Sequence, residues 1–132
     1  MYLLDTDTCS YLMRRTHPAL IDRVRAFHAG ELKVSVVTQY ELEYGVRRSD
    51  RVEELGLVVA AFLGNVEVLP FDVPAARRAA QVRGGLAASG TMIGSYDLLI
   101  AGHALALGAT LVTNNTQEFG RVPGLRVENW AR

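Results

Sequence analysis

Residues 1–9 read MYLLDTDTC, and this stretch decides which fold the rest of the chain is expected to adopt. Residues 2–5 form a short apolar run that ends in an acid, which is typical of a buried strand ending at the edge of a sheet. A single threonine separates Asp5 from Asp7. Two kinds of phosphate chemistry use such a start. In one, an aspartate is the nucleophile and a second aspartate its acid and base; in the other, an aspartate is a metal ligand.

The composition is that of one globular domain spanning residues 1–132. This length is enough for a hydrophobic core, and an apolar content of 49% argues against disorder. No apolar run approaches the ~20 residues that a membrane-spanning helix needs, and no signal peptide is evident, so we expect a cytoplasmic protein without a membrane partner. Cys9 is the only cysteine, which excludes an intramolecular disulfide and a zinc site built from several cysteines.

Net charge does not direct this chain to nucleic acid. Its 14 basic and 14 acidic residues give a formal net charge of zero, so binding to RNA or DNA depends on a local patch. Arg14–Arg15 and the group Arg47, Arg48 and Arg51 are candidates for such a patch. Cations near helix ends and on solvated helix faces have the same sequence pattern, so this assignment stays open.

Further strands and helices alternate along the chain. Strands are predicted at 32–37, 66–69, 109–113 and 125–129, because these runs are apolar or β-branched. Helices are predicted at about 6–15, 16–30, 38–49, 50–63, 72–88 and 98–107, with Thr16 and Asp50 as N-caps of the second and the fourth. This order predicts an α/β fold in which helices cover both faces of a parallel sheet. In such sheets the functional site lies at the carboxyl ends of the strands.

Four acids fall at this predicted edge of the sheet. Asp5 ends the first strand and Glu41 lies one helical turn after the second. Asp97 starts the helix before the fourth strand, and Glu118 follows that strand. Carboxylates that lie close together repel one another, and burial adds to the cost of their charge. A divalent cation removes this penalty, and carboxylate oxygens are ligands that Mg²⁺ and Mn²⁺ prefer, so the sequence predicts a metal site.

Each of these acids also has a purely structural interpretation. Asp5 and Asp97 could cap the helices that they begin, and Thr38 with Glu41 has the spacing of a capping box. Glu118 could be a solvated surface charge. The shared position of all four at one edge favours the functional interpretation. The remaining acids are expected on the ordinary surface, among them Asp22, Glu53, Glu54, Glu67 and Glu128.

The nucleophilic-aspartate interpretation is the weaker of the two. Phosphatases of the haloacid-dehalogenase-like fold carry Asp-x-Asp-x-Thr/Val after the first strand, and here the fifth position is Cys9. They also need a lysine well after that strand, but the only lysine is Lys33, at the start of the second strand. Their late pair of acids for Mg²⁺ is missing, because Asp97 stands alone. A phosphatase is kept as an alternative.

Four segments of the chain closely resemble the PIN-domain toxins of the VapC type. They are LLDTDTCSYL at 3–12, SVVTQYELEYGV at 35–46, IGSYDLLIAGHALALGATLVTNNTQEF at 93–119 and VPGLRVENW at 122–130. The resemblance implies a PIN-like three-layer α/β/α sandwich with a central parallel sheet of about five strands. It also implies a Mg²⁺- or Mn²⁺-dependent endoribonuclease, the toxin of a type II toxin–antitoxin system, which inhibits translation until a VapB-type antitoxin binds it. A homodimer is expected.

Within this resemblance, the first three acids of the family fall on Asp5, Glu41 and Asp97. After the fourth strand this chain has an amide where the family has an acid, followed by Glu118, so the fourth ligand position is weaker. The secondary candidates are Asp7, Thr113, Asn114 and Asn115. Asp7 is an extra carboxylate that could tighten metal binding or cap the first helix, and the cap is favoured.

The chemistry implied by the resemblance is hydrolysis of an RNA phosphodiester that leaves a 5′-phosphate and a 3′-hydroxyl. A metal ion on Asp5 and Asp97 acidifies a water molecule, while Glu41 and Glu118 complete its surroundings or orient the water. Relatives suggest transfer RNA, in particular an anticodon stem-loop, although ribosomal and messenger RNA stay open. A module that binds RNA but lost its metal is a second alternative, because Asn115 replaces an acid.

Histidine and cysteine are not expected in the site. His103 follows Asp97 by six residues, which places it about 120° around the helix axis, so a buried or rim position is expected. Cys9 is expected in the core. His17 and His28 are expected to be structural.

The helical hairpin expected over 38–63 lies beside the site. It carries more apolar side chains than one buried stripe requires, namely Tyr40, Leu42, Tyr44 and Val46. The family resemblance makes this hairpin a candidate groove for the antitoxin, with homodimerisation elsewhere on the surface.

Overall fold

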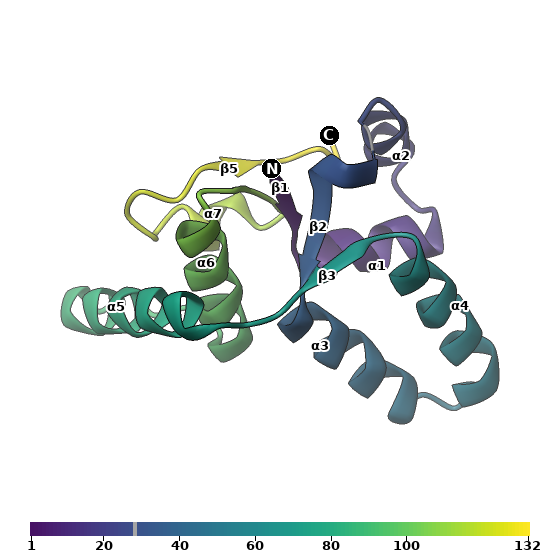
Figure 1. Ribbon diagram of the computed structural model, residues 1–132, viewed down its shortest axis with the longest axis horizontal. Coiled ribbons are helices and arrows are strands. Elements are labelled where there is room, and N and C mark those ends of the chain that lie inside the picture. The colour runs from purple at the N-terminus through teal and green to yellow at the C-terminus, as the bar shows by residue number, and fades with distance from the viewer. Residues whose placement is uncertain (28) are drawn as a thin grey trace.

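The computed structural model describes residues 1–27 and 29–132, and its five strands form one sheet (Figure 1). The strands are β1 (Tyr2–Leu4), β2 (Leu32–Ser35), β3 (Glu67–Leu69), β4 (Thr110–Val112) and β5 (Val127–Glu128). Their order is β3-β2-β1-β4-β5, and every neighbouring pair is parallel. The first strand is therefore central, with Tyr2 in register with Leu32 on one side and with Thr110 on the other. The predicted five-stranded parallel sheet is confirmed.

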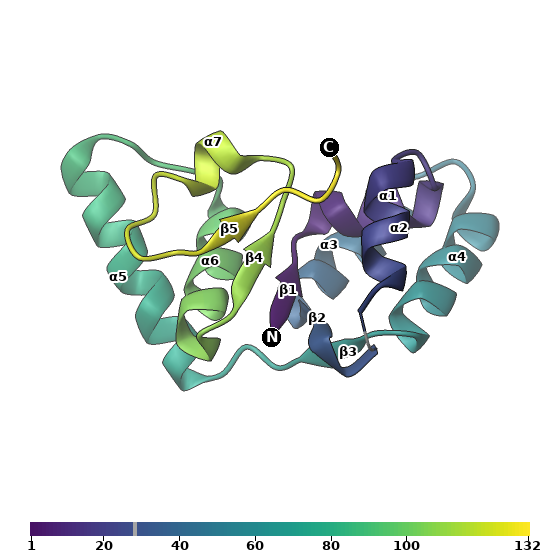
Figure 2. The same ribbon diagram turned by 90° about the horizontal axis from the view of Figure 1, so that it is seen from above.

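Helices cover both faces of this sheet, as the alternating pattern predicted. They are α1 (Thr6–Arg14), α2 (Pro18–Arg25), α3 (Val36–Arg47), α4 (Val52–Gly64), α5 (Val73–Ser89), α6 (Ser95–Leu107) and α7 (Thr116–Phe119), with a 3₁₀ turn η1 at Ala29–Glu31. Figure 2 shows α5 and α6 on one side of the central strands and α1, α2 and α4 on the other. Within the described residues no helix is both long enough and apolar enough to cross a bilayer.

Alternation along β1 divides the core into two parts. Successive side chains of a strand point to opposite faces of the sheet. Leu3 packs into a cluster with residues of α5 and α6, such as Val82 and Ile100. Leu4 packs into a second cluster with Cys9 of α1 and Val59 of α4. Both leucines are almost fully buried, so β1 holds the two layers of helices together.

Several element boundaries differ from the prediction. The second strand ends at Ser35, whose hydroxyl accepts a hydrogen bond from the backbone N–H of Val37 at 3.1 Å and so caps α3. The predicted start of this helix at Thr38 is therefore wrong. A serine hydroxyl satisfies a free N–H at a helix start, and the β-branched residues after it were misread as strand because they continue an apolar run.

Two predicted N-caps are also wrong. His17 precedes α2, and the Thr16 hydroxyl instead lies 2.8 Å from Nδ1 of His17. Arg51 precedes α4, and the Ser49 hydroxyl accepts from its N–H at 3.3 Å, so Asp50 makes no cap. The second helix also ends at Arg25, well before the predicted Gly30.

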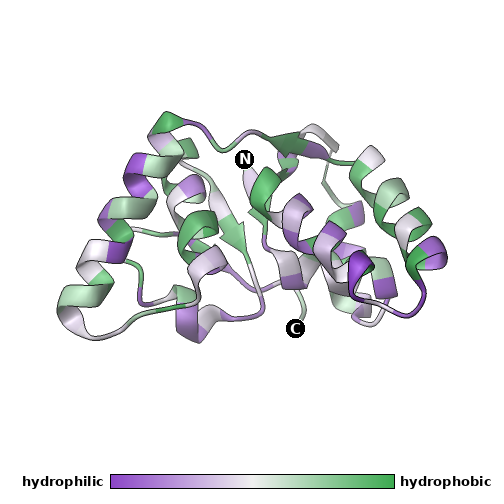
Figure 3. Ribbon diagram, turned by 90° about the horizontal axis from the view of Figure 1, so that it is seen from below, coloured by the Kyte–Doolittle hydropathy of each residue, from purple (hydrophilic) through white to green (hydrophobic). Residues whose placement is uncertain are grey.

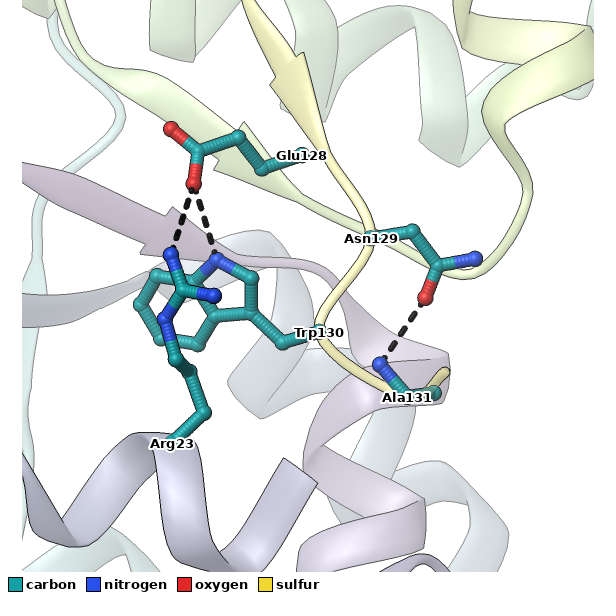
Figure 4. A network of polar contacts seen from close by, with 5 residues as sticks. All are labelled: Arg23, Glu128, Asn129, Trp130 and Ala131. Atoms are coloured by element: carbon teal, nitrogen blue, oxygen red, sulfur yellow. Dashed lines mark hydrogen bonds and ion pairs between the residues drawn. The ribbon is translucent and has the colours of Figure 1, made fainter. Parts of the chain in front are cut away.

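A cluster of aromatic and charged side chains fixes the C-terminal segment (Figure 4). Trp130 is buried and stacks on Phe27 with ring centroids 4.8 Å apart. Its indole N–H donates to the Glu128 carboxylate at 3.0 Å, and Arg23 of α2 approaches the same oxygen at 3.5 Å. Glu128 lies at the surface, as predicted, with 38% of its side chain exposed, and it also contacts Trp130 and Arg23. These contacts connect the end of the chain to α2.

Helices α5 and α6 approach each other closely at a glycine. A Cβ built on Gly102 of α6 would lie 2.4 Å from the Cα and the N of Ala79 in α5. Such a distance is a clash with backbone, which a rotamer change of a side chain cannot relieve. The packing of α5 against α6 therefore requires glycine at this position.

We predict that Gly102→Ala destabilises the protein by about 1–3 kcal/mol or more, because the added methyl forces α5 away from α6. Gly84→Ala is the matched control, since Gly84 is exposed on α5 with open space around it. That substitution should stabilise the protein by about 0.5–1 kcal/mol, as expected for alanine in a helix interior. Urea unfolding measures both, and an unchanged stability of Gly102→Ala would contradict the packing argument.

Candidate active site

The parallel sheet brings the predicted acids to one edge. Asp5 follows the last residue of β1, and Asp97 lies in the first turn of α6. Glu41 lies in the second turn of α3, which starts directly after β2. Glu118 belongs to the short helix α7 that follows β4. Four separate segments of the chain therefore supply these carboxylates.

Asp5 is a buried acid that both caps a helix and faces the site. Its exposed fraction is 3%, and its Oδ1 accepts a hydrogen bond from the backbone N–H of Thr8 at 2.8 Å. Burial raises the pKa of Asp5 to about 6, although hydrogen bonds from Thr113 and Thr8 oppose this shift. The capping interpretation of Asp5 is correct, and it does not exclude a functional role, because only one carboxylate oxygen is used by the cap.

Glu41 is held by a residue far away in the sequence. Its Oε1 accepts from the Thr6 hydroxyl at 2.7 Å, and the same hydroxyl lies 3.1 Å from that of buried Thr38. Because Ser35 caps this helix, the structural alternative of a capping box formed by Thr38 and Glu41 is excluded. Burial is the largest cause that raises the pKa of Glu41; the Thr6 hydrogen bond lowers it and the charge of Asp7 raises it further.

Asp97 and Glu118 meet at Gly94. A Cβ on Gly94 would lie 3.3 Å from Oδ2 of Asp97 and 3.8 Å from Oε1 of Glu118. The backbone N–H of Gly94 donates to Oε1 of Glu118 at 2.9 Å. Gly94 is also the residue that precedes α6, so the structural alternative in which Asp97 caps this helix is excluded. The loop before α6 thus holds two carboxylates close together.

The pKa of Asp97 is raised further above its ordinary value than that of Asp5. Burial raises the pKa of Asp97 to about 7, and the negative charges of Glu118, Glu41 and Asp5 add to this shift in that order. The four acids therefore share one electrostatic environment in which their charges repel. This is the situation that the sequence predicted for the edge.

The donor set suits a hard divalent cation that keeps water ligands. Across residues 1–27 and 29–132, no three Asp, Glu, His or Cys side chains come close enough together to enclose a metal ion by themselves. Mg²⁺ binds through one or two carboxylates and retains several waters, so it does not need a closed protein cage. Carboxylate oxygens whose charges repel, as those around Asp97 do, fit such an ion.

The secondary candidates divide into two groups. Buried Thr113 accepts from the N–H of Asn115 at 2.9 Å, and the Asn115 amide donates to the Glu118 carboxylate. These two residues shape the loop after β4. Asn114 is exposed and its Oδ1 accepts from Asn129 at 3.1 Å. Asp7 is exposed in the first turn of α1, where Asp5 is already the cap, so the favoured capping role of Asp7 is wrong.

Two residues of the site were missed from the sequence. Thr6 orients Glu41, and the only available signal was its place between two aspartates. Gly94 contacts Glu118 through its backbone, and the available signal was its place three residues before Asp97 in the segment IGSYD. Both act on partners that are distant along the chain.

Cys9 and His103 are buried in the core, as predicted. His103 is buried with its Nδ1 2.8 Å from the Ser35 hydroxyl, and burial lowers its pKa. Cys9 is also buried, which raises the pKa of its thiol well above the ordinary value. His28 lies outside the described residues.

A groove of about 800 Å³ borders the acids between α1, α3 and α4. Its lining includes acidic Asp7 and Glu41 as well as basic Arg14 and Arg48. Of the four side chains predicted to form an apolar hairpin surface, only two are exposed. Tyr40 and Tyr44 are accessible, whereas Leu42 and Val46 are buried.

Comparison with known proteins finds a matching family model and similar sequences over nearly the whole chain. The sequence matches the family model described as PIN domain over residues 2–125. It is 39% identical over 129 residues to a tRNA(fMet)-specific endonuclease VapC of Salmonella typhimurium, covering 98% of this chain and 97% of that one. It is 35% identical over 131 residues to ribonuclease VapC2 of Rickettsia felis, covering 98% of each chain.

Solved structures agree with the sequence comparison. The fold superposes with a TM-score of 0.93 on DNA-bound VapBC from Salmonella typhimurium, at 39% identity and covering 98% of this chain and 97% of that one. VapBC2 from Rickettsia felis, bound to a DNA fragment from their promoter, gives a TM-score of 0.92 at 35% identity, with 98% of each chain covered. The similarity extends over almost the entire length.

We predict that the metal-free protein loses stability as the pH rises from about 5 to about 8. The pKa of Asp5 is raised to about 6 and that of Asp97 to about 7. Folding therefore favours the protonated carboxyls, and this contribution is lost as the pH passes through the raised values. Asp97→Asn should stabilise the protein by about 1–2 kcal/mol at the upper pH, after allowance for solvent screening.

Urea unfolding in the presence of a chelator, at about pH 5 and about pH 8, measures this difference. Asp22→Asn is the matched control, because Asp22 is an exposed acid on α2. If Asp97→Asn and the wild type showed the same dependence on pH, the burial of Asp97 and the charges around it would not raise its pKa as described.

Proposed function

The chain belongs to the VapC-type ribonucleases of the PIN-domain family, and on this premise we propose that it hydrolyses RNA phosphodiester bonds at the acidic edge with Mg²⁺ or Mn²⁺. It is the endoribonuclease toxin of a VapBC-type toxin–antitoxin system. The observation that carries the proposed chemistry is that Asp5, Glu41, Asp97 and Glu118 come from four segments and share one electrostatic environment.

Asp5 and Asp97 are the residues that would hold the metal ion. A divalent ion bound there supplies an acidified water molecule and neutralises charge on the phosphate. Glu41 is fixed through Oε1 by Thr6, which orients its carboxylate toward the edge. Glu118 is fixed by Gly94 at one oxygen and by Asn115 at the other. These two glutamates complete the surroundings of the ion or orient the attacking water, and the products carry a 5′-phosphate and a 3′-hydroxyl.

Transfer RNA is the proposed substrate, in particular an anticodon stem-loop. The support is the relative from Salmonella typhimurium, which is named a tRNA(fMet)-specific endonuclease. A formal net charge of zero means that affinity for RNA comes from local contacts near the site. Cleavage of a transfer RNA in the cytoplasm would inhibit translation.

A VapB-type antitoxin is the proposed protein partner, acting on a homodimer of this chain. The two superposed relatives are VapBC complexes. The groove between α1, α3 and α4 is the proposed seat, because it borders the acids and continues onto α4. Val58 lines this groove from α4 with 44% of its surface accessible, and Leu57 of the same helix is 75% accessible. Figure 3 shows the hydrophobic character of this helix.

We predict that Asp5→Asn and Asp97→Asn each reduce RNA cleavage by about 100-fold or more, because a neutral amide holds a divalent cation poorly. Gel analysis of transfer RNA incubated with purified protein and Mg²⁺ measures this loss. Asp22→Asn, an exposed acid far along the chain from the site, is the control and should cleave like the wild type. Circular dichroism checks that each variant is folded.

The alternatives give different results in the same assay. A module that only binds RNA would retain RNA without cleaving it, with or without metal. A phosphatase would release phosphate from a small phosphomonoester and become phosphorylated on Asp5. Cleavage that survives a chelator, or that persists in Asp97→Asn, would contradict the metal-dependent mechanism.

We predict that Thr6→Val lowers cleavage by about 10-fold, because it removes the hydroxyl that orients Glu41 while keeping nearly the same volume. Thr6→Ser keeps the donor and is the matched control, which should retain most of the activity. The comparison is made on kcat and KM separately, since loss of orientation lowers kcat. Equal activity of the valine and serine variants would show that the hydrogen bond has no role in positioning.

A further inference from the structure

Three exposed tyrosines stand directly beside the acidic edge. Tyr40 precedes Glu41 on α3, and Tyr96 precedes Asp97 on α6. Tyr44 lies one helical turn after Tyr40. Their exposed fractions are 52% for Tyr40, 57% for Tyr44 and 43% for Tyr96, so their rings are available to a ligand.

These rings form one connected surface, which we call the tyrosine platform. The rings of Tyr40 and Tyr44 are nearly parallel, at 8°, with centroids 6.5 Å apart. The rings of Tyr40 and Tyr96 are 5.4 Å apart, and the Tyr96 hydroxyl donates to the Tyr40 hydroxyl at 3.2 Å. Arg48 extends the platform, with its guanidinium 5.8 Å from the centre of the Tyr44 ring.

The hydrophobic core does not account for this platform. The buried face of α3 is formed by Leu42 and Val46, whereas Tyr40 and Tyr44 lie on its exposed side. Their mutual contacts, and the hydroxyl bond to Tyr96, hold the rings in a fixed orientation outside the core. Exposed aromatic rings held beside a reactive site are suited to bind flat ligands.

We propose that the tyrosine platform stacks unpaired bases of the RNA next to the scissile phosphate, while Arg48 contacts a phosphate of the same strand. This inference rests on the ribonuclease function proposed above and specifies the form of its substrate. Aromatic side chains stack on bases only when those bases are free of a duplex. The platform therefore selects cleavage positions in single-stranded loops rather than in helical stems.

Charge attraction does not draw RNA to this edge, so an RNA occupant needs another source of affinity. Phosphates approaching Glu41 and Asp97 are repelled by the carboxylates, and the zero net charge of the chain offers no compensating attraction. Stacking supplies affinity that does not depend on charge. The rings of Tyr40 and Tyr96 meet between α3 and α6, and the charge of Glu41 acts on Tyr96, so a base on the platform would lie close to the acids.

The first test measures RNA binding without cleavage. Fluorescence anisotropy of a labelled oligoadenylate of about 12 nucleotides is recorded with the Asp97→Asn protein in chelator. The measurement is repeated with double variants that carry Asp97→Asn together with Tyr44→Leu or Tyr96→Leu. Each leucine should weaken binding about 5- to 100-fold, as expected for loss of one stacked base. Tyr44→Phe keeps the ring and should bind within about twofold of its parent. Val73→Ser removes an exposed apolar side chain on α5 and serves as the control.

The second test uses the RNA rather than the protein as the variable. A cleavable stem-loop is compared with copies in which single loop nucleotides beside the cut are abasic, for wild-type protein and for Tyr44→Leu. With wild type, an abasic position should lower kcat/KM about 10-fold, mainly through KM. With Tyr44→Leu the same abasic change should have little effect, because the partner ring is already absent.

Separate outcomes overturn the platform and the nuclease assignment. If wild type cleaves RNA but the leucine variants bind and cleave equally well, the platform is wrong while the ribonuclease stands. If wild type cleaves no RNA, the proposed function itself fails. Light scattering of the RNA-free variants tests whether a second copy of the chain occupies the platform. A change of oligomeric state in Tyr44→Leu would identify the platform as a contact between copies and would contradict the proposal. Antitoxin binding lost while RNA binding is retained would likewise contradict the proposal.

Discussion

The parallel pairing of β1 with both β2 and β4 is the constraint on which the site depends. Tyr2 is in register with Leu32 and with Thr110, so three strands finish at the same level of the sheet. Asp5 emerges at that level, and the segments after β2 and β4 begin there. Had either neighbour run antiparallel, its carboxyl end would lie at the opposite edge and the carboxylates would be separated.

This constraint has an energetic cost that the core must offset. Asp5 is buried and Asp97 is surrounded by other negative charges, which raises the pKa of both carboxyls. Leu3 and Leu4 pack the central strand into two hydrophobic clusters, one on each face. Burial of apolar surface by both layers of helices is what allows the fold to hold repelling charges in fixed positions.

Asn115 stands where the resemblance to VapC-type toxins implies an acid, and it orders the site through its own hydrogen bonds. Its amide donates to the Glu118 carboxylate, and its backbone N–H donates to Thr113. A carboxylate at this position could not donate to Glu118 and would add to the repulsion around it. The amide thus acts as a support for an acid, and the number of carboxylates at the edge falls while the position of Glu118 is kept.

The sequence by itself determined the strands, their parallel arrangement, the four acids at one edge and the burial of Cys9 and His103. These features follow from apolar periodicity and from the alternation of strands and helices along the chain, both of which can be read from the sequence. Only the tertiary structure decided which groups hold the acids. The bond between Thr6 and Glu41 joins residues 35 apart, and that between Tyr40 and Tyr96 joins residues 56 apart. The local pattern offered a capping box as the structural alternative for Glu41, because such a pattern depends only on neighbours along the chain. The actual side-chain partners depend on which strands lie side by side.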